Sequence, residues 1–428
     1  MELPTLPSDP LLEIITRFDD VETVVRCAAV CKPLRRAILD PDLFPRRLAS
    51  SAAANGGFDP DLLLSVTYWP LAVNSIHSGE HFPADAFEQT ASSRVRFDAD
   101  LLLSYQLLSS RDGLLVLGRN HEAPDDAQMS ASDIELLVCN TITGHVTSVP
   151  RLNHRGASGA FRSGIHPPVL LSTGGGGGRR SFELLVMYKG DYFLSVSREI
   201  QIFSSQRSEW GAARWIHKPP RMELARAAST VPAVVGRTVH WLACKDNAEQ
   251  VKFRGGDLLI LALHAEEAQE ATVIKLPQGL LTSLTTSTEW EHNLAHNLIL
   301  AATAEGKRLS IVAAENLAIS VWTLLPDHQE HQGSSISWSR EVVIRRGQIG
   351  RQLALFPLDA YQPIRFSAFG ERSGTVLFWM REVGLVQLNL GTKKVLVIWK
   401  GRNHNYLRSK AFLHEAHLVS LLQSMKPF

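Results

Sequence analysis

Short apolar runs recur along most of the chain, and they constrain the fold more than any other feature of the sequence. From about residue 62 they are five to seven residues long and are separated by turn residues. The clearest are 114–118, 135–139, 182–188, 238–244, 258–264, 297–303, 309–314, 318–324, 375–380, 385–390 and 395–399. Their length fits strands, and their close spacing is typical of antiparallel sheets rather than of strands alternating with helices.

The number of these runs predicts the architecture of the body. Roughly 20 candidate strands are present, and β-propellers use about four strands per blade. Residues 305–307 and 381–384 have the length and composition of hairpin turns. No strict repeat of about 45 residues is visible, so the prediction rests on strand density. It is a mostly antiparallel β-propeller of five or six blades over residues 62–428, with a β-sandwich as the alternative.

The C-terminal stretch differs from the runs before it. Between residues 411 and 425 the apolar positions follow helical spacing, at Leu418, Val419, Leu422 and Met425. We therefore expect a C-terminal helix that packs back on the body. The polar segments 174–180 and 327–337 are expected to be loops.

The first 50 residues have the periodicity of helices. Asp9 and Pro10 suit the N-cap and first position of one helix, and Pro33 suits the first turn of a third. The apolar stripes are Leu11, Leu12, Ile14, Ile15 and Phe18; Val21, Val24, Val25 and Ala28; and Leu34, Ala37 and Ile38. Three helices in about 40 residues are close to the lower limit for independent folding. The module therefore either caps the β-body or completes its core against a partner, which makes the whole chain α+β.

Charge and composition exclude several classes of function. The chain has 44 basic and 43 acidic residues, and a net charge of +1 provides no field for nucleic acid or an anionic membrane. No stretch approaches the roughly 18 apolar residues of a membrane span, and the N-terminus has no signal-peptide pattern. Four cysteines are too few for a disulfide framework. We expect a protein of the cytoplasm, the nucleus or both, without nucleic-acid or membrane partners.

Motifs for catalysis or metal binding are incomplete. His414-Glu415-Ala416-His417 is one residue shorter than the zinc-binding helix motif, so the polar face of a terminal helix is the simpler interpretation. The glycine-rich segment 174–180 lacks the Lys and Ser or Thr of a phosphate loop, and residues 156–159 are not a nucleophile elbow. The sequence predicts no catalytic residue, no metal site and no cofactor.

Tryptophan is the remaining candidate for recognition, with nine in the chain. Four of them lie inside strand-like runs and are expected in the core: Trp241, Trp322, Trp379 and Trp399. Three lie in polar segments near turns: Trp210, Trp290 and Trp338. If these three lie on a face of the propeller, they are candidate anchors for a target protein.

The N-terminal residues resemble the F-box family. The resemblance is carried by residues 6–18 (LPSDPLLEIITRF), Val24, Arg26 and residues 30–38 (VCKPLRRAI), which follow the order and spacing of the family. Leu34 is a departure, because the family usually has Trp there. A weaker resemblance in the body, for example at residues 109–117 and 231–242, is to plant F-box proteins of a group in grasses with an uncharacterised, β-rich C-terminal domain.

This resemblance implies a domain layout and a function. The layout is an F-box at 4–48, a linker at 49–61 and a propeller-like substrate-recognition domain at 62–428. F-box proteins bind a Skp-type adaptor and, through it, a cullin ubiquitin ligase, while the second domain presents a target, here unknown. The implied adaptor-binding residues are Leu6, Pro7, Leu11, Ile14, Ile15, Val30, Cys31 and Leu34.

The chain would then be a non-catalytic receptor subunit of a ubiquitin ligase complex. Two alternatives stay open. One is an interaction protein whose F-box-like module is not coupled to ubiquitin transfer. The other is an enzyme or carbohydrate-binding propeller with a helical cap.

Overall fold

A computed structural model describes most of the β-body and isolated positions before it. The described residues are 13, 27–28, 35, 38, 58–69, 88–89, 98, 100–120, 134–141, 144–152, 165–171, 181–188, 197–219, 222–224, 231–245, 258–266, 270–284, 294–303, 307–326, 337–355, 363–381, 383–400 and 410–415. In the N-terminal region Glu13, Cys27, Ala28, Arg35 and Ile38 are helical, as predicted at these positions, and Ala28 and Ile38 are buried. The rest of the predicted three-helix module lies outside the described residues.

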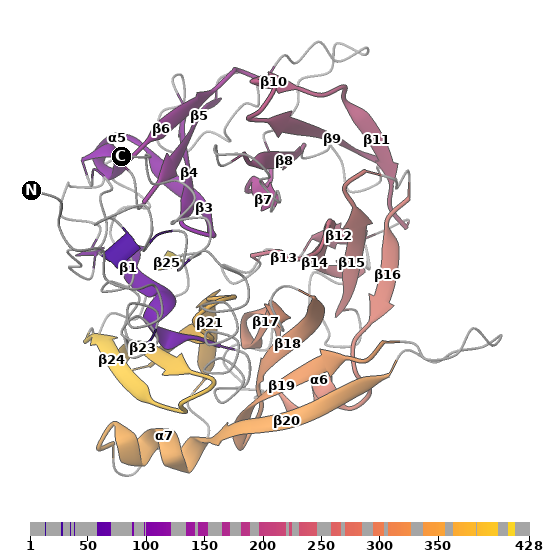
Figure 1. Cartoon of the computed structure of the whole chain (residues 1–428). Coiled ribbons are helices and arrows are strands. Elements are labelled where there is room, and N and C mark those ends of the chain that lie inside the picture. Colours follow the sequence, from indigo (N-terminus) through magenta and orange to yellow (C-terminus); the bar gives the residue numbers. More distant parts are fainter. Residues whose placement is uncertain are drawn as a thin grey trace, which may run out of the picture.

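Antiparallel sheets arranged in a ring form the body (Figure 1). Three have a simple order of four strands along the sheet. One contains β3 (Gln106–Arg111), β4 (Leu114–Asn120), β5 (Ile134–Asn140) and β6 (Val146–Val149). The second contains β17 (Leu298–Thr303), β18 (Arg308–Ala314), β19 (Ala318–Leu324) and β20 (Trp338–Arg345). The third contains β21 (Ile364–Phe369), β22 (Thr375–Met380), β23 (Gly384–Asn389) and β24 (Val395–Trp399).

Two further sheets have five strands but only four strand positions. The first contains β7 (Val169–Leu171), β8 (Glu183–Met187), β9 (Ser197–Ser204), β10 (Glu209–Trp210) and β11 (Arg214–His217). The second contains β12 (Met222–Leu224), β13 (Ala233–Val235), β14 (Thr238–Lys245), β15 (Leu258–His264) and β16 (Thr272–Lys275). β10 and β11 share one edge of β9, and β12 and β13 share one edge of β14, so each pair is an interrupted strand. All five sheets are therefore four-stranded propeller blades.

A smaller sheet closes the ring between the first and last blades. It contains β1 (Leu63–Trp69), β2 (Glu88–Gln89) and β25 (Lys410–Glu415), in the order β2-β1-β25. β25 lies innermost and contacts β3 and β21, the inner strands of the two neighbouring blades. The propeller thus has five full blades and a closing sheet made from both ends of the body. This agrees with the predicted five or six blades.

Apolar side chains fill the space between each pair of neighbouring sheets. In β4, for example, Leu114 and Val116 pack toward the β7–β11 blade, while Leu115 and Leu117 pack toward Phe412 of the closing sheet. A strand that is buried on both faces has no need for alternating polar residues. This explains why the strands appear in the sequence as continuous apolar runs.

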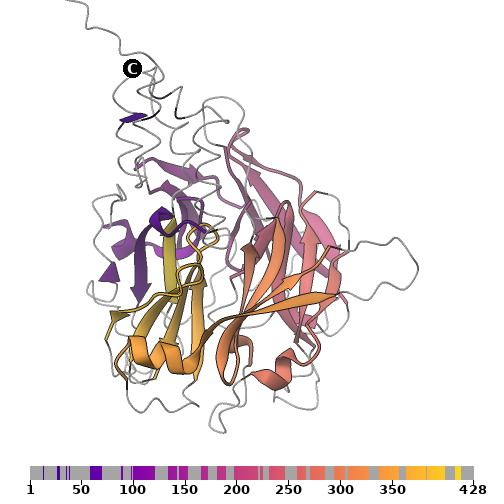
Figure 2. The same ribbon diagram turned by 60° about the horizontal axis from the view of Figure 1, so that its bottom comes forward.

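Helices contribute little to the described part of the body. α5 (Leu101–Ser104), α6 (Leu280–Ser283), η1 (Pro60–Leu62) and η5 (Leu294–Asn297) are single turns, and α7 (Arg346–Gln352) lies at the outer edge of the ring (Figure 2). None of the helices in this part of the chain is long and apolar enough to cross a membrane.

The predicted strands are confirmed and the predicted C-terminal helix is wrong where the structure describes it. All eleven apolar runs coincide with strands, and residues 305–307 and 381–384 connect β17 to β18 and β22 to β23 as hairpins. Residues 411–415, which we expected in a helix, belong to β25 instead, because β1 offers them an antiparallel partner. Residues 416–428, segment 174–180 and most of segment 327–337 lie outside the described residues.

Candidate functional site

The residues implied for adaptor binding lie outside the described part of the chain. These are Leu6, Pro7, Leu11, Ile14, Ile15, Val30, Cys31 and Leu34, and Trp290 lies outside it as well. Their roles therefore stay predictions.

Trp210 and Trp338 are half-buried and pack into the body. The indole N–H of Trp210 donates a 2.7 Å hydrogen bond to the carbonyl oxygen of Pro150, and its ring lies 5.5 Å from that of Phe203. Trp338 packs against the apolar cluster between the β12–β16 and β17–β20 blades. Of the four tryptophans expected in the core, Trp241 and Trp379 are buried, and Trp322 and Trp399 pack against the core.

His414 and Glu415 lie on the inner strand β25. The predicted position on the polar face of a helix is therefore wrong. Both are buried. A 2.7 Å hydrogen bond joins Thr67 Oγ1 to His414 Nε2. Glu415 accepts hydrogen bonds from the backbone N–H groups of Ser373 at 2.8 Å and Arg372 at 3.3 Å. The two side chains thus attach β25 to β1 and to the turn between β21 and β22.

Arg111 ties four blades together at the centre of the ring. It ends β3, and its guanidinium donates to Glu371 Oε2 at 3.1 Å, to the carbonyl oxygen of Leu170 on β7 at 3.1 Å and to that of Val234 on β13 at 3.2 Å. Beside it, Arg372 Nε donates to Asp112 Oδ1 at 3.1 Å. We call Arg111, Asp112, Glu371 and Arg372 the central cluster.

The central cluster lies at one face of the ring for a topological reason. Asp112 and Gly113 connect β3 to β4, and residues 370–374 connect β21 to β22, so both turns join the first two strands of a blade. Asp112 and Gly113 have φ angles of 51° and 74°, which suits a tight two-residue hairpin. We call this side of the ring the hub face and the opposite side the far face.

Electrostatics favour the paired state of the cluster. Burial opposes the charge of Arg111, but the carboxylates of Glu371 and Asp112 outweigh it and raise the pKa of the guanidinium. Burial raises the pKa of Glu415, and the hydrogen bonds from Ser373 and Arg372 oppose this only in part. The arrangement is that of a half-buried, internally paired anchor rather than of an acid and base directed at a substrate.

The connection to the N-terminal module joins the body at the same turn. Asp59 N–H donates a 2.9 Å hydrogen bond to the carbonyl oxygen of Arg372, and the Phe58 ring meets Phe369 edge-on at 6.2 Å. Phe58 also lies directly over Gly374, where a Cβ would come within 2.4 Å of its Cγ. The turn at 371–374 therefore contacts the chain that enters the body at residues 58–59, the closing strand β25, and Arg111 at the centre of the ring.

Gly374→Ala is expected to destabilise the body more than Gly236→Ala. Both glycines have left-handed φ angles, 65° and 59°, but only Gly374 has a neighbour within 4 Å of the added methyl. The backbone conformation alone costs about 1 kcal/mol, and the clash with Phe58 adds roughly 1–3 kcal/mol. Urea unfolding of the two variants measures the difference. Adding Phe58→Ala should make the difference in stability between the two variants smaller, because the clashing ring is removed. Equal losses of stability in Gly374→Ala and Gly236→Ala would contradict the contact.

A metal centre is not assembled in the described residues. In that part of the chain no three His, Cys, Asp or Glu side chains are grouped as metal ligands would be. Glu315 and Arg340 form a second charged group. The Glu315 carboxylate accepts hydrogen bonds from Trp322 Nε1 and Arg340 Nε, both at 3.1 Å. Glu315 is buried, and the hydrogen bonds from Arg340 and Trp322 outweigh its desolvation and lower its pKa. It fixes the turn between β18 and β19.

Comparison with known families assigns most of the chain. Residues 76–428 match the family model described as "Domain of unknown function (DUF7595)". The chain belongs to the DUF7595 family. Residues 3–49 match the F-box-like model, so an F-box-like module precedes the DUF7595 body. The family match begins after β1, although β1 is needed to close the ring in this structure. No curated protein matches the chain significantly.

Solved structures share only a distant likeness with the DUF7595 body. One is a prolyl endopeptidase at 11% identity and a TM-score of 0.32. The match covers 73% of this chain and 36% of the endopeptidase. A putative 6-phosphogluconolactonase from Bacteroides fragilis has 9% identity, 70% coverage of both chains and a TM-score of 0.34. The β-propeller domain of the Trilobed protease from Pyrococcus furiosus has 11% identity, coverages of 68% and 67%, and a TM-score of 0.30. The chain spans about a third of the endopeptidase, and likenesses this weak carry no argument about function.

Proposed function

We propose that this protein is the substrate-recognition subunit of a Skp-cullin-F-box ubiquitin ligase, acting in the cytoplasm, the nucleus or both. The observation that carries the proposal is the F-box-like match over residues 3–49. F-box modules are interaction modules that commonly bind a Skp-type adaptor. In this role the chain catalyses no reaction. It raises the local concentration of a target lysine near the ubiquitin-carrying enzyme.

The architecture of the DUF7595 body supports a receptor role. Its centre is filled at the hub face by Arg111 and its partners, and its blades are packed on both sides by apolar clusters. A body packed in this way is expected to lose little conformational entropy when it binds. It is suited to hold a bound protein at a fixed place.

The double variant Leu11→Asp/Ile15→Asp is expected to bind a Skp-type adaptor at least about 100-fold more weakly than the natural chain. Each buried Leu or Ile contributes about 1.5–3 kcal/mol, and two buried carboxylates add a desolvation cost. Isothermal titration of the purified full chain with the adaptor measures this. Glu13→Gln, at an exposed position of the same helical segment, is the matched control.

Two outcomes decide between this proposal and its alternative. If the natural chain does not bind the adaptor, or binds no better than the double variant, the ligase role is wrong. If the adaptor binds but reconstituted ligase with cullin does not promote turnover of captured proteins, the module is an F-box-like interaction module that is not coupled to ubiquitin transfer.

A further inference from the structure

The outermost strand of the β21–β24 blade differs from the outer strands of the other blades. β24 ends its sheet at the rim of the ring, so one of its edges has no paired strand in the described part of the chain (Figure 1). The outer strands β6, β10, β11, β16 and β20 each carry at least one charged or hydroxyl-bearing residue. β24 has the sequence VLVIW and carries none. Because proteins usually protect open edges with polar residues, β24 is the rim strand best suited to accept another strand.

The pairing of β24 with β23 shows which of its backbone groups point outward. The N–H of Asn389 donates a 3.0 Å hydrogen bond to the carbonyl oxygen of Lys394. The pairs that follow are Leu388–Val395, Gln387–Leu396 and Val386–Val397. Hydrogen-bonded and non-hydrogen-bonded pairs alternate along an antiparallel ladder. The N–H and C=O groups of Val395 and Val397 therefore point away from the blade.

Gln352 of α7 occupies part of this edge in the way that the backbone of a neighbouring strand would. Its side-chain amide donates to the carbonyl oxygen of Lys393 at 3.1 Å and accepts from the N–H of Val395 at 2.9 Å. Within the described residues, Val397 makes no hydrogen bond beyond those of the ladder. The edge of β24 thus binds an amide group at Val395, and the same kind of position at Val397 is open. Gln352 is itself exposed, so a peptide backbone can exchange with its two hydrogen bonds.

Apolar side chains beside the edge would be covered by an added strand. Leu396 is 45% exposed, and Val397 and Ile398 are half-buried. Val397 packs on the apolar cluster between this blade and the β17–β20 blade, and Ile398 packs on the cluster beside the closing sheet. Ile398 is the extra residue of a bulge, so the regular edge runs from Lys393 to Val397. Because the blade already holds this strand in place, binding along it orders little of the body.

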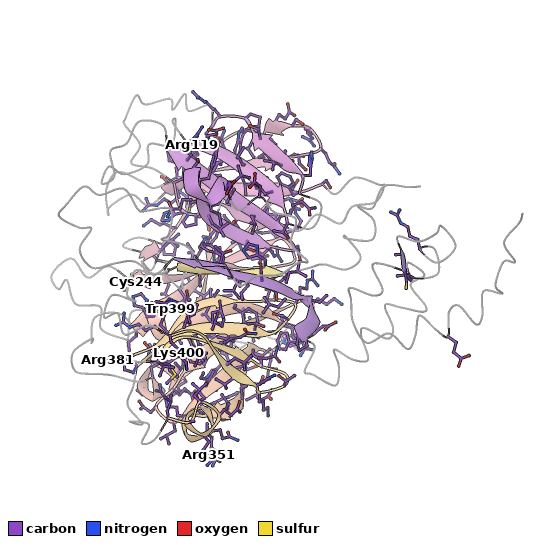
Figure 3. All side chains as sticks on the ribbon, turned by 90° about the vertical axis from the view of Figure 1, so that its left-hand side faces the viewer. Arg119, Cys244, Arg351, Arg381, Trp399 and Lys400 are labelled. Carbon is purple, nitrogen blue, oxygen red and sulfur yellow. The ribbon has the colours of Figure 1, made fainter. Side chains whose placement is uncertain are left out.

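Exposed lysines flank β24 at both ends. Lys393 and Lys394 precede the strand at the hub face, and Lys400 follows it at the far face, on the same side of the body as Arg381 in Figure 3. None of the ion pairs of the described residues includes these three lysines. If β24 of a second copy paired with this edge about a two-fold axis, the lysines before one strand would face the lysine after the other. Like charges at opposed positions disfavour pairing, so the lysines favour a partner segment with carboxylates at its ends over a second copy.

We propose that the open edge of β24 takes an extended segment of a partner protein as a fifth strand of its blade, and that this segment has apolar residues at its centre and Asp or Glu at its ends. Gln352 leaves the edge when the segment binds. In strand addition of this kind, backbone hydrogen bonds supply affinity and the side chains along the edge select the segment. Calling the partner a ligase target rests on the proposed function, whereas the addition of a strand does not.

Peptides of equal charge test whether the backbone is recognised. The probe is a fluorescein-labelled peptide, Asp-Glu-Thr-Val-Thr-Val-Thr-Glu-Asp, titrated with the full chain and followed by fluorescence anisotropy. Alternate residues of an added strand bond to the edge. N-methyl groups are therefore placed either on both valines or on the two threonines that precede them. One of these two sets should weaken binding about tenfold or more, and the other less than about threefold.

Variants of the chain locate the binding at β24. Gln352→Ala should tighten binding of the peptide about threefold or more, because the segment no longer displaces the amide, and tighter binding cannot result from a loss of folding. Gln348→Ala, at an exposed position of the same helix, should leave it unchanged. Lys400→Glu should weaken binding about threefold or more. Lys275→Glu, at the exposed far-face end of β16, should change it by less than about 1.5-fold.

Four results would overturn the proposal. They are no saturable binding of the peptide by the natural chain, equal weakening by the two sets of N-methyl groups, binding to Gln352→Ala that is no tighter, and dimerisation of Gln352→Ala in analytical ultracentrifugation. The last would assign the edge to a second copy. Adaptor binding is measured on the same proteins and should be unchanged. A natural chain that binds the peptide but not the adaptor would refute the ligase role and leave the β24 site standing.

Discussion

Replacing Arg111 with Met is expected to lower the free energy of unfolding of the full chain by up to about 3–5 kcal/mol. That is the usual cost of removing one partner of a fully buried ion pair, and Arg111 and Glu371 are half-buried. The methionine retains most of the apolar volume but none of the donors. Glu371 would lose its partner, and the carbonyl groups of Leu170 and Val234 would lose theirs. These groups belong to three other blades, so the damage should spread around the ring.

Urea unfolding, followed by tryptophan fluorescence, measures this loss. Arg119→Met is the matched control, because Arg119 pairs with Glu135 at 2.8 Å but its side chain is 39% exposed, against 13% for Arg111. Surface pairs of that kind contribute about 0–1 kcal/mol. Adding Glu371→Gln to Arg111→Met should recover about 1 kcal/mol, since the uncompensated, half-buried carboxylate is removed.

The loss in Arg111→Met should also depend on pH. Burial raises the pKa of Glu371, while Arg111 opposes that rise in the natural chain. Without Arg111 the rise is larger, and a carboxyl group whose folded pKa exceeds its unfolded pKa destabilises the fold above that unfolded value. The deficit should therefore shrink as pH falls from neutral toward about 5. A loss below about 1 kcal/mol at neutral pH would mean that the central cluster is not an anchor.

The sequence was informative where the fold depends on local patterns. The apolar runs at 258–264, 318–324, 375–380 and 395–399 coincide with β15, β19, β22 and β24 because strands buried on both faces need continuous apolar residues. Residues 411–415 were predicted wrongly because helical spacing farther along, at Leu418, Val419 and Leu422, was extended back over them. Their strand pairing depends on β1, about 350 residues earlier, which no local pattern reveals.

The central cluster could not be predicted from the sequence for the same reason. Arg111-Asp112 and Glu371-Arg372 each appear as charged turns, which are normally solvated. They are 260 residues apart and meet only because both connect the first two strands of a blade. The Asp112-Gly113 pair was a usable signal for a hairpin, and placing each hairpin turn on a common propeller face would have brought the charges together.

Acid should destabilise the DUF7595 body through three histidines whose pKa values are lowered. Burial lowers the pKa of His240, His296 and His414 from 6.5 to about 4, with the positive charge of Arg365 adding to the effect at His296. A histidine of lowered folded pKa contributes stability that is present above its unfolded value and is lost as pH falls toward its folded value. The loss here begins near pH 6.5 and is complete near pH 4.

The size of this loss makes it measurable at single residues. Lowering the pKa of a histidine from 6.5 to about 4 on folding corresponds to a loss of roughly 3 kcal/mol in acid, and to less at half-buried His296. Burial raises the pKa of Glu415, so its carboxylate takes up a proton in the folded state as the pH falls. This proton uptake offsets part of the loss of stability caused by the histidines.

His414→Gln can keep a hydrogen bond to Thr67 but does not titrate. Urea unfolding at about pH 7.5, 6.5 and 5.5 should show a smaller loss for it than for the natural chain. Exposed His145→Gln should follow the natural chain. If His414→Gln instead loses stability in parallel with both, the buried His414 does not drive acid unfolding of the closing strand.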